Sequence, residues 1–320
     1  MFLLQDNETM FCTIMSAGNL LYLLRMRKRR HRENPVGGMA GRVGRARSAN
    51  GIRPCALTIA GSDSGGNAGI QADLRAFHAW GLHGATVLAA LTAQNPRGVS
   101  AIHQVPPDFV EAQLKAVFAM YGVKALKTGM LADAEVIRVV ARELARRKGV
   151  KKVIDPVMVA TSGARLLEAG AAAALKGQLI PLATVITPNL PEAAELLGRE
   201  VRAEDACDAA RELAREFGCA ALVKGGHAVE GAAGRGAREV VDFLYDGRRM
   251  HRFAAPFVER PVSTHGTGCT LAAAIAAGLA LGAPLGAAVK KAKEYVYEAI
   301  KISYHVGRNC GVLGMPERRR

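Results

Sequence analysis

Short apolar runs alternate with longer amphipathic segments along most of the chain. The apolar runs have the length of strands and cover residues 56–61, 85–91, 125–129, 152–155, 184–189 and 220–226. The amphipathic segments have helical spacing and fall near residues 73–80, 107–121, 133–147, 191–197 and 204–217. Continuous apolar strands separated by amphipathic helices are typical of a mainly parallel sheet that helices cover on both faces. We therefore expect an α/β fold.

The last third of the chain departs from this alternation. Residues 239–255 contain two strand-like runs around Asp246 and Gly247, which predict a hairpin and thus a small antiparallel edge of the sheet. Two helices, near residues 268–281 and 285–305, are expected to close the domain. The folded domain is expected to span residues 53–308, and residues 309–320 are expected to form a short basic tail.

The first 52 residues differ in composition from the rest. They hold nine Lys or Arg against three Asp or Glu, within a chain whose formal charge is +15. The apolar run 11–24 precedes the basic run 25–32, which is the reverse of a secretory signal, and it is shorter than the ~20 residues of a membrane helix. We expect either a disordered basic extension or a gene model that is too long, in which translation begins at a later methionine such as Met39. A membrane anchor or a transit sequence is the alternative.

The charge and the cysteines restrict the partners. The basic excess has no aromatic residues interleaved with it and matches no nucleic-acid-binding module, so we expect no nucleic acid; an anionic phosphate substrate explains the charge equally well. The six cysteines form no Cys-x-x-Cys pair and no zinc spacing. This usage is typical of a reducing compartment, and we expect a cytoplasmic protein with no membrane partner.

Polar and glycine-rich segments follow the predicted strands. In open parallel sheets, ligands bind beyond the carboxyl ends of the strands. Seven such segments would meet at one edge of the sheet and form one site, namely residues 61–69, 92–95, 127–131, 155–158, 187–192, 224–227 and 265–269.

A predicted helix begins within the segment Gly266–Cys269. Two glycines allow a tight turn, and the helix start adds unpaired N–H groups and a positive dipole end. We expect Gly266, Thr267 and Gly268 to form an anion hole suited to a phosphoryl group in transfer. Cys269 at a helix start is expected to have a lowered pKa, so that its thiolate accepts a proton from an attacking hydroxyl. A small buried thiol is the alternative.

Three strand ends carry side chains suited to metal or phosphate. Asn189 and Glu192 could hold Mg²⁺ through its waters, or they could cap a helix. Asp155 stands at a strand end, where it is a candidate partner of a metal or a phosphate. Lys224 precedes two glycines and could reach a nucleotide phosphate as a point charge, or it could be a surface lysine.

Other strand ends are suited to a small ring. Asp63 lies among polar residues before a glycine-rich loop that could cradle a hydroxyl. Gln94 offers an amide donor and acceptor together, which match the edge of an aminopyrimidine. Met130 and Val157 could supply flat apolar walls, or they could be ordinary core residues. His265 and His227 flank the site and could contact phosphate.

The common nucleotide motifs are absent. The chain has no G-x-x-x-x-G-K-[ST] segment, no G-x-G-x-x-G segment and no His-Arg-Asp kinase loop. If the protein binds nucleotide phosphates, a different phosphotransferase architecture must bind them.

Taken together, the motifs resemble one family. The segments "ALTIAGSDSGGNAGIQADLRAF", "LTAQN", "KTGML", "DPVMVATSG", "TPNLPEAAELLG", "LVKGGH", "DFLYDG" and "STHGTGCTLAAAIA" are similar to those of the hydroxymethylpyrimidine/phosphomethylpyrimidine kinases of thiamine biosynthesis. The resemblance covers residues 55–300 and implies a ribokinase-like fold and a homodimer. It also implies transfer of phosphate from ATP, with Mg²⁺, first to 4-amino-5-hydroxymethyl-2-methylpyrimidine and then to its monophosphate.

The resemblance also implies roles for single residues. Cys269 matches the proposed catalytic base, and the residues before it match the anion hole. Gln94 matches the group that reads the pyrimidine edge, and the rest of that pocket matches Ala68, Met130 and Val157. The metal and phosphate side matches Asp155, Asn189, Glu192 and Lys224.

Two departures and two alternatives accompany the resemblance. Asn67 stands where the family more often has glycine, and the basic connection 228–242 is long.

A pyridoxal kinase of vitamin B6 salvage shares the fold and the chemistry, so it is the first alternative. A non-catalytic pyrimidine-binding regulator is the second.

Overall fold

The computed structural model describes residues 52–158, 170–230, 238–308 and 310–316. All of these residues belong to the unit that spans residues 45–320. The expected basic extension lies outside the described residues, apart from its last position. Within the described ranges, no helix combines the length and the apolar character needed to cross a bilayer.

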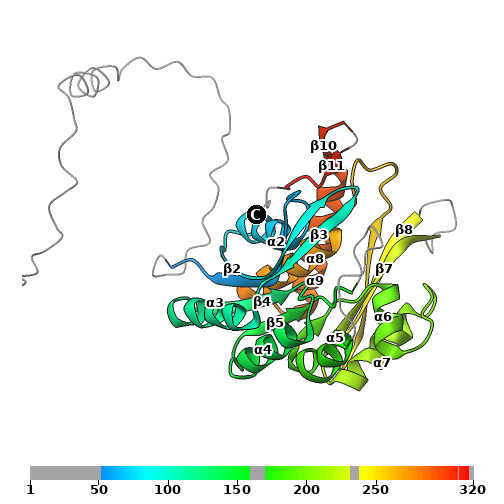
Figure 1. The fold of residues 1–320 in the computed structure, drawn as a ribbon. Helices are drawn as coiled ribbons and strands as arrows, with labels where there is room; N and C mark the ends of the chain where they lie inside the picture. The colour runs from blue at the N-terminus through cyan, green and yellow to red at the C-terminus, as the bar shows by residue number, and fades with distance from the viewer. Residues whose placement is uncertain (1–51, 159–169, 231–237, 309, 317–320) are drawn as a thin grey trace, which may run out of the picture. The chain divides into compact units, whose positions relative to one another are not determined.

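A mainly parallel sheet forms the centre of the described fold, as expected (Figure 1). Its strand order is β3-β2-β1-β4-β5-β6-β7-β8-β9, and the run from β2 to β7 is parallel. The strands are β1 (Cys55–Asp63), β2 (His83–Asn95), β3 (Gly98–Gln104), β4 (Val123–Thr128), β5 (Lys151–Ile154), β6 (Val185–Ile186), β7 (Ala220–Glu230), β8 (Arg238–Tyr245) and β9 (Met250–Pro256). The hairpin β8–β9 pairs antiparallel at one edge, which confirms the predicted antiparallel edge.

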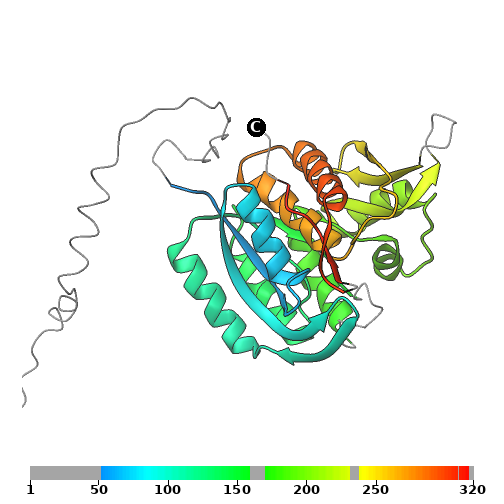
Figure 2. The same ribbon diagram turned by 90° about the horizontal axis from the view of Figure 1, so that it is seen from above.

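Helices cover both faces of this sheet (Figures 1 and 2). One face packs against α2 (Gly69–Ala79), α8 (Thr267–Ala280) and α9 (Leu285–Lys301). The other face packs against α3 (Pro107–Met120), α4 (Ala134–Ala145), α5 (Ala171–Ala174), the π-helical turn η1 (Leu175–Leu179), the 3-10 turn η2 (Ile180–Leu182), α6 (Leu190–Leu197) and α7 (Ala206–Phe217). Apolar residues of the sheet therefore lie between two helix layers, as continuous apolar strands require.

The helix behind the anion-hole segment is buried along almost its whole length. Residues 270–280 of α8 are all buried, and most of them are alanine. Small side chains let α8 approach both the sheet and α9. A Cβ atom at Gly278 would lie 2.9 Å from the Cβ of Ala288 on α9, so glycine permits this close packing.

Two predicted loops are strands in the structure. β2 continues through Gln94 and turns into β3, with which it pairs antiparallel. β7 likewise continues past Lys224, with an irregular register between Lys224 and Ala228. The β2–β3 ribbon tolerates polar residues because most of β3 is exposed.

The last predicted helix is too long. α9 ends at Lys301, and β10 (Tyr304–Gly307) then pairs antiparallel with β11 (Cys310–Val312). The run Tyr304–Val306 favours a strand because aromatic and β-branched residues fit a pleated surface. Residues 312–314, within the expected tail, are buried.

Candidate active site

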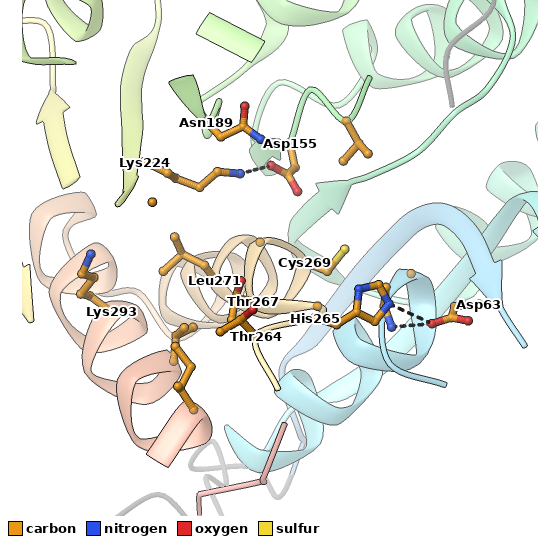
Figure 3. A pocket seen from close by; sticks show the side chains of 18 of the residues that line it. Asp63, Asp155, Asn189, Lys224, Thr264, His265, Thr267, Cys269, Leu271 and Lys293 are labelled. Atoms are coloured by element: carbon orange, nitrogen blue, oxygen red, sulfur yellow. Dashed lines mark hydrogen bonds and ion pairs between the residues drawn. The ribbon is translucent and has the colours of Figure 1, made fainter. Parts of the chain in front are cut away.

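A cavity of about 490 Å³ opens at the carboxyl ends of the parallel strands (Figure 3). Its walls come from strands β1, β2, β4, β7, β8 and β9, from helices α2, α6, α8 and α9, and from the loops between them. The cavity brings together every site residue expected from the sequence, namely Asp63, Ala68, Gln94, Met130, Asp155, Val157, Asn189, Glu192, Lys224, Gly266, Thr267, Gly268 and Cys269. His265 lines it too, whereas the side chain of His227 lies outside the described part.

The start of α8, where the anion hole was expected, follows a tight turn and lines the cavity. Gly266 adopts φ +86° just before the helix, and a Cβ atom there would overlap the carbonyl oxygen of Asn67. The Gly266 carbonyl accepts hydrogen bonds from Thr270, from the N–H at 2.9 Å and from the hydroxyl at 2.8 Å. The first N–H groups of a helix have no partner within it, and Gly268 and Cys269 line the cavity. A phosphoryl oxygen at this point would meet backbone donors and the positive end of the helix.

The expected lowering of the Cys269 pKa is wrong. Burial raises the pKa of the Cys269 thiol above its ordinary value, and the Asp73 and Asp155 carboxylates raise it further. The ammonium of Lys127 and a hydrogen bond from the Gly69 N–H oppose this shift without cancelling it. Cys269 is therefore a thiol at neutral pH. The helix start alone predicted the opposite, because the loss of water and the distant carboxylates arise only from the tertiary fold.

A buried ion pair beneath the cavity went unnoticed in the sequence. The Nζ atom of Lys127 on β4 lies 3.0 Å from both carboxylate oxygens of Asp73 on α2, and the Thr58 hydroxyl donates to Asp73 at 2.6 Å. All three side chains are fully buried. Burial disfavours the charge of Lys127, but the Asp73 carboxylate, its hydrogen bond to Lys127, and the nearby Cys269 and Asp155 together outweigh burial and keep the pKa of Lys127 above its usual range. A lysine within an apolar strand was the signal in the sequence.

Three charged side chains lie together on the side of the cavity formed by the loop after β5, by α6 and by β7. Figure 3 shows two of them, Lys224 and Asp155, pointing toward one another. The Nζ atom of Lys224 lies 3.1 Å from Asp155 Oδ1 and 3.8 Å from Glu192 Oε2. The Thr187 hydroxyl also donates to Asp155 Oδ1, at 2.8 Å. Burial raises the pKa of Glu192 to about 7, although Lys224 lowers it. Lys224 is mostly buried in this contact, so it is no free surface lysine.

Asn189 and Glu192 cap α6, which confirms the second alternative expected for them, and both also line the cavity. The Asn189 side chain accepts from the Glu192 N–H at 2.8 Å, and Glu192 Oε2 accepts from the Asn189 N–H at 2.8 Å. Among the described residues, Glu192 Oε1 and Asp155 Oδ2 accept no hydrogen bond. No cluster of three or more His, Cys, Asp or Glu suited to a metal occurs there either. Two carboxylate oxygens fit Mg²⁺ only if phosphate and water complete its six ligands.

Asp63 shapes the loop at the opposite wall. Its carboxylate accepts N–H groups from Gly65 at 2.8 Å, Asn67 at 2.9 Å and Ala68 at 2.8 Å. The His265 Nε2 atom lies 4.0 Å from the same carboxylate (Figure 3). The loop therefore wraps around Asp63, and the contacts of Asp63 in the structure are with the protein.

Gln94 and an apolar wall complete this part of the cavity. The Thr92 hydroxyl donates to Gln94 Oε1 at 3.1 Å, and the backbone N–H of Gln94 donates to Ser64 Oγ at 2.8 Å. Met130 packs with Ala90 and Ala132, and Val157 packs against this small cluster. A polar edge beside a flat apolar surface suits a substituted aromatic ring.

A second buried pair, also missed in the sequence, lies on the side of the cavity formed by β8 and α9. Lys293 Nζ on α9 donates to Asp242 Oδ2 on β8 at 2.6 Å, and Asp242 Oδ1 accepts the N–H of Gly225 at 3.0 Å. Apolar side chains surround this side of the cavity, among them Val240, Phe257, Val258, Val296 and Ile300. The pair is adjacent to Lys224, because Asp242 lies opposite Lys224 in the β7–β8 register.

The fold and the site together define a kinase of the ribokinase-like class. The Bacillus subtilis pyridoxal kinase, solved as an ADP complex, has a TM-score of 0.73 and 36% identity, covering 83% of this chain and 98% of its own. The phosphomethylpyrimidine kinase of Clostridium difficile 630 has a TM-score of 0.66 and 38% identity, covering 77% of this chain and 99% of its own.

Sequence comparison identifies the family. Residues 63–314 match the family model described as phosphomethylpyrimidine kinase. The hydroxymethylpyrimidine/phosphomethylpyrimidine kinase of Rhizobium meliloti is 51% identical over 247 residues, which are 77% of this chain and 90% of that protein. The thiamine biosynthesis bifunctional protein ThiED of Geobacter sulfurreducens is 48% identical over 260 residues, 81% of this chain but only 51% of that protein. The chain belongs to the phosphomethylpyrimidine kinase family, which confirms the resemblance found in the sequence.

Proposed function

We propose that the protein transfers phosphate from ATP to 4-amino-5-hydroxymethyl-2-methylpyrimidine and then to the resulting monophosphate, in thiamine biosynthesis. The observation that carries the proposal is the position of the segment Gly266–Cys269, where α8 begins and backbone N–H groups could bind a phosphoryl group. It shares one cavity with a wall suited to a ring, at Gln94 and Met130, and with the charged side chains around Lys224. Membership of the phosphomethylpyrimidine kinase family supports the choice of substrate.

Positioning and charge stabilisation would carry most of the catalysis. Phosphoryl transfer involves little covalent chemistry for the protein, so donors aimed at the moving group matter most. In this proposal the N–H groups of Gly268 and Cys269 and the ammonium of Lys224 stabilise the charge on that group. Gln94 would bind the amino edge of the pyrimidine, and Ala68, Met130 and Val157 would enclose the ring. Asp63 would act by holding the loop that carries Ala68.

Cys269 would accept the proton of the attacking hydroxyl. Because its thiol is protonated at neutral pH, only the small thiolate fraction can do so, and Lys127 and the Gly69 N–H favour that fraction. The hydroxyl oxygen forms the new bond to phosphorus, its proton moves to the sulfur, and ADP leaves. This assignment requires turnover to rise with pH.

The nucleotide would occupy the apolar side of the cavity near Phe257 and Val296, with its phosphates toward Lys224 and the anion hole. Asp155 and Glu192 would hold Mg²⁺ through their two remaining oxygens, and Asn189 would keep Glu192 in place by capping α6. When bound, Mg²⁺ neutralises phosphate charge. Removing it with a chelator should abolish turnover, and adding it back should restore turnover.

A coupled assay of ADP release tests the proposal. Hydroxymethylpyrimidine and pyridoxal are offered in parallel with ATP and Mg²⁺. Release of two ADP per pyrimidine with little turnover of pyridoxal is the expected result. Turnover of pyridoxal alone would instead assign vitamin B6 salvage, an alternative favoured by the similarity to pyridoxal kinases of known structure. Pyrimidine binding without turnover of either compound would indicate a binding protein.

We further propose a cytoplasmic homodimer of a kinase domain preceded by a basic extension, with no nucleic-acid or membrane partner. Exposed Leu91 and Ile102 on the β2–β3 ribbon support a partner at that edge. Light scattering after gel filtration measures the mass, and one chain mass would contradict the dimer. Deleting residues 1–51 should leave turnover unchanged.

A further inference from the structure

We propose that Ser303, in the turn between α9 and β10, positions the anion hole and thereby sets the rate of phosphoryl transfer. The inference rests on the proposed kinase function, but the contacts behind it do not. Ser303 lies outside the cavity, and none of the motifs that point to the family includes it.

The hydroxyl of Ser303 holds two consecutive backbone groups. Its oxygen accepts the N–H of Val262 at 3.1 Å and that of Ser263 at 3.4 Å. Both belong to residues 257–266, the loop that joins β9 to α8 and forms one wall of the cavity. A loop has no ladder partners for its N–H groups, so one side-chain oxygen provides what a neighbouring strand would otherwise provide.

The contact leads directly to the anion hole. Ser263 Oγ accepts the N–H of His265 at 3.2 Å, and the Thr264 carbonyl accepts the N–H of Thr267 at 3.3 Å. Gly266, which follows His265, lies tightly against the backbone of Asn67. The loop before α8 is therefore held at its end by Asn67 and near its middle by Ser303.

The C-terminal hairpin gives Ser303 a firm base. The hairpin continues directly from the end of α9 (Figure 1). A Cβ atom at Gly311 would overlap the carbonyl oxygen of Val262, so β11 lies against the same loop residue that Ser303 binds. The N–H of Gly314 donates to the Ala299 carbonyl at 3.0 Å, which ties the segment after β11 back to α9. The hairpin thus links α9, which lines the cavity, to the loop that enters the anion hole.

Loss of the hydroxyl should lower turnover and leave pyrimidine binding intact. Without Ser303 Oγ, the N–H groups of Val262 and Ser263 lose their acceptor, and the anion-hole donors move relative to the transferring group. Catalytic geometry tolerates little displacement, so Ser303→Ala is expected to lower kcat about tenfold. The KM for the pyrimidine should stay the same, because Gln94 and Met130 lie on other elements.

The experiment compares three variants. Ser303→Ala removes the acceptor, and Ser303→Thr retains it. Thr184→Ala is the matched control, because the Thr184 hydroxyl accepts one backbone N–H, that of Lys152 at 3.0 Å, at the opposite end of the sheet. Hydrogen–deuterium exchange of a peptide covering residues 257–266 measures the contact, steady-state kinetics measures its consequence, and thermal melting measures any general loss of stability.

We expect faster exchange and lower kcat in Ser303→Ala, and neither change in Ser303→Thr or Thr184→Ala. Unchanged exchange in Ser303→Ala would overturn the contact, and faster exchange with unchanged kcat would overturn the positioning role. An equal loss of kcat in Thr184→Ala would make the effect one of general stability and also overturn it. A wild-type chain that turns over neither pyrimidine nor pyridoxal would overturn the proposed function, while the exchange comparison would still test the contact.

Discussion

Two regions of the cavity differ in how they are built. Around Gln94 the wall is apolar, and a loop folds around the carboxylate of Asp63. Around Lys224, three charged side chains face one another. The first region, here called the ring side, includes Met130 and Val157 and relies on shape and on backbone hydrogen bonds. The second, the phosphate side, includes Asp155 and Glu192 and holds charges out of water.

The two regions should therefore differ in how much a substitution costs. Buried charges are costly unless they are paired, so removing one of them leaves its partner exposed to that cost. An apolar wall loses only contact area when a side chain is shortened. We therefore expect large effects on rate or stability from the phosphate side and moderate effects on affinity from the ring side.

The largest effect on stability is expected at the buried Lys127–Asp73 ion pair. Lys127→Met leaves the Asp73 carboxylate unpaired in the core, and the free energy of unfolding should fall by about 3–5 kcal/mol. Urea denaturation measures it. Lys115→Met, which breaks an exposed pair with Glu111, is the control and should change stability little. Equal stability of Lys127→Met and the wild type would show that the pair is dispensable.

Lys224→Met should have the next largest effect and should act on rate. Loss of the ammonium removes charge stabilisation from the phosphoryl group, and kcat should fall by about 10²–10³-fold. Single-turnover measurements with saturating substrate separate this step from product release. Lys224→Arg keeps the charge and should retain part of the activity. Equal losses of kcat in the two variants would show that the site requires the shape of the lysine side chain and not its charge. The phosphate side would then depend on shape, as the ring side does.

Cys269→Ala should lower kcat by about 10²-fold and spare nucleotide affinity, because a single proton acceptor is lost. The thiol pKa lies above its ordinary value, so the thiolate fraction and the kcat of the wild type should rise as pH increases above neutrality. The alanine variant should lack that rise. A pH–rate profile of both proteins decides the matter, and parallel profiles would remove Cys269 as the base.

The smallest effect is expected on the ring side. Gln94→Ala removes a donor and an acceptor from the pyrimidine edge, and KM for the pyrimidine should rise about tenfold with kcat nearly unchanged. Gln94→Glu keeps an acceptor and loses the donor, so it identifies which group the ring requires. A fall in kcat alone would contradict the division of the cavity into two sides.

The sequence was sufficient wherever the signal is local. Apolar runs and helical spacing predicted the parallel sheet, and polar residues at strand ends predicted which side chains line the cavity. The cap of α6 could be predicted because Asn189 and Glu192 are three positions apart. The same reasoning failed at Cys269, whose pKa depends on burial and on distant carboxylates.

The pairs that were missed join residues far apart in the chain. Lys127 and Asp73 are separated by 54 positions, and Lys293 and Asp242 by 51. Each lysine lies in an apolar or amphipathic segment, where a pattern shows that it is unusual but does not show its partner. Only the packing of α2 against β1, which lies beside β4 in the sheet, and of α9 against β9, which lies beside β8, brings the charges together.

The protonated state of Cys269 has a consequence for oxidative stress. Peroxides and alkylating agents react with thiolates, and a thiol with a raised pKa presents little thiolate to them. We therefore expect Cys269 to react more slowly with peroxide than a low-pKa cysteine does, although it lines the cavity. The desolvation that would slow proton acceptance would thus also slow oxidation of the same sulfur.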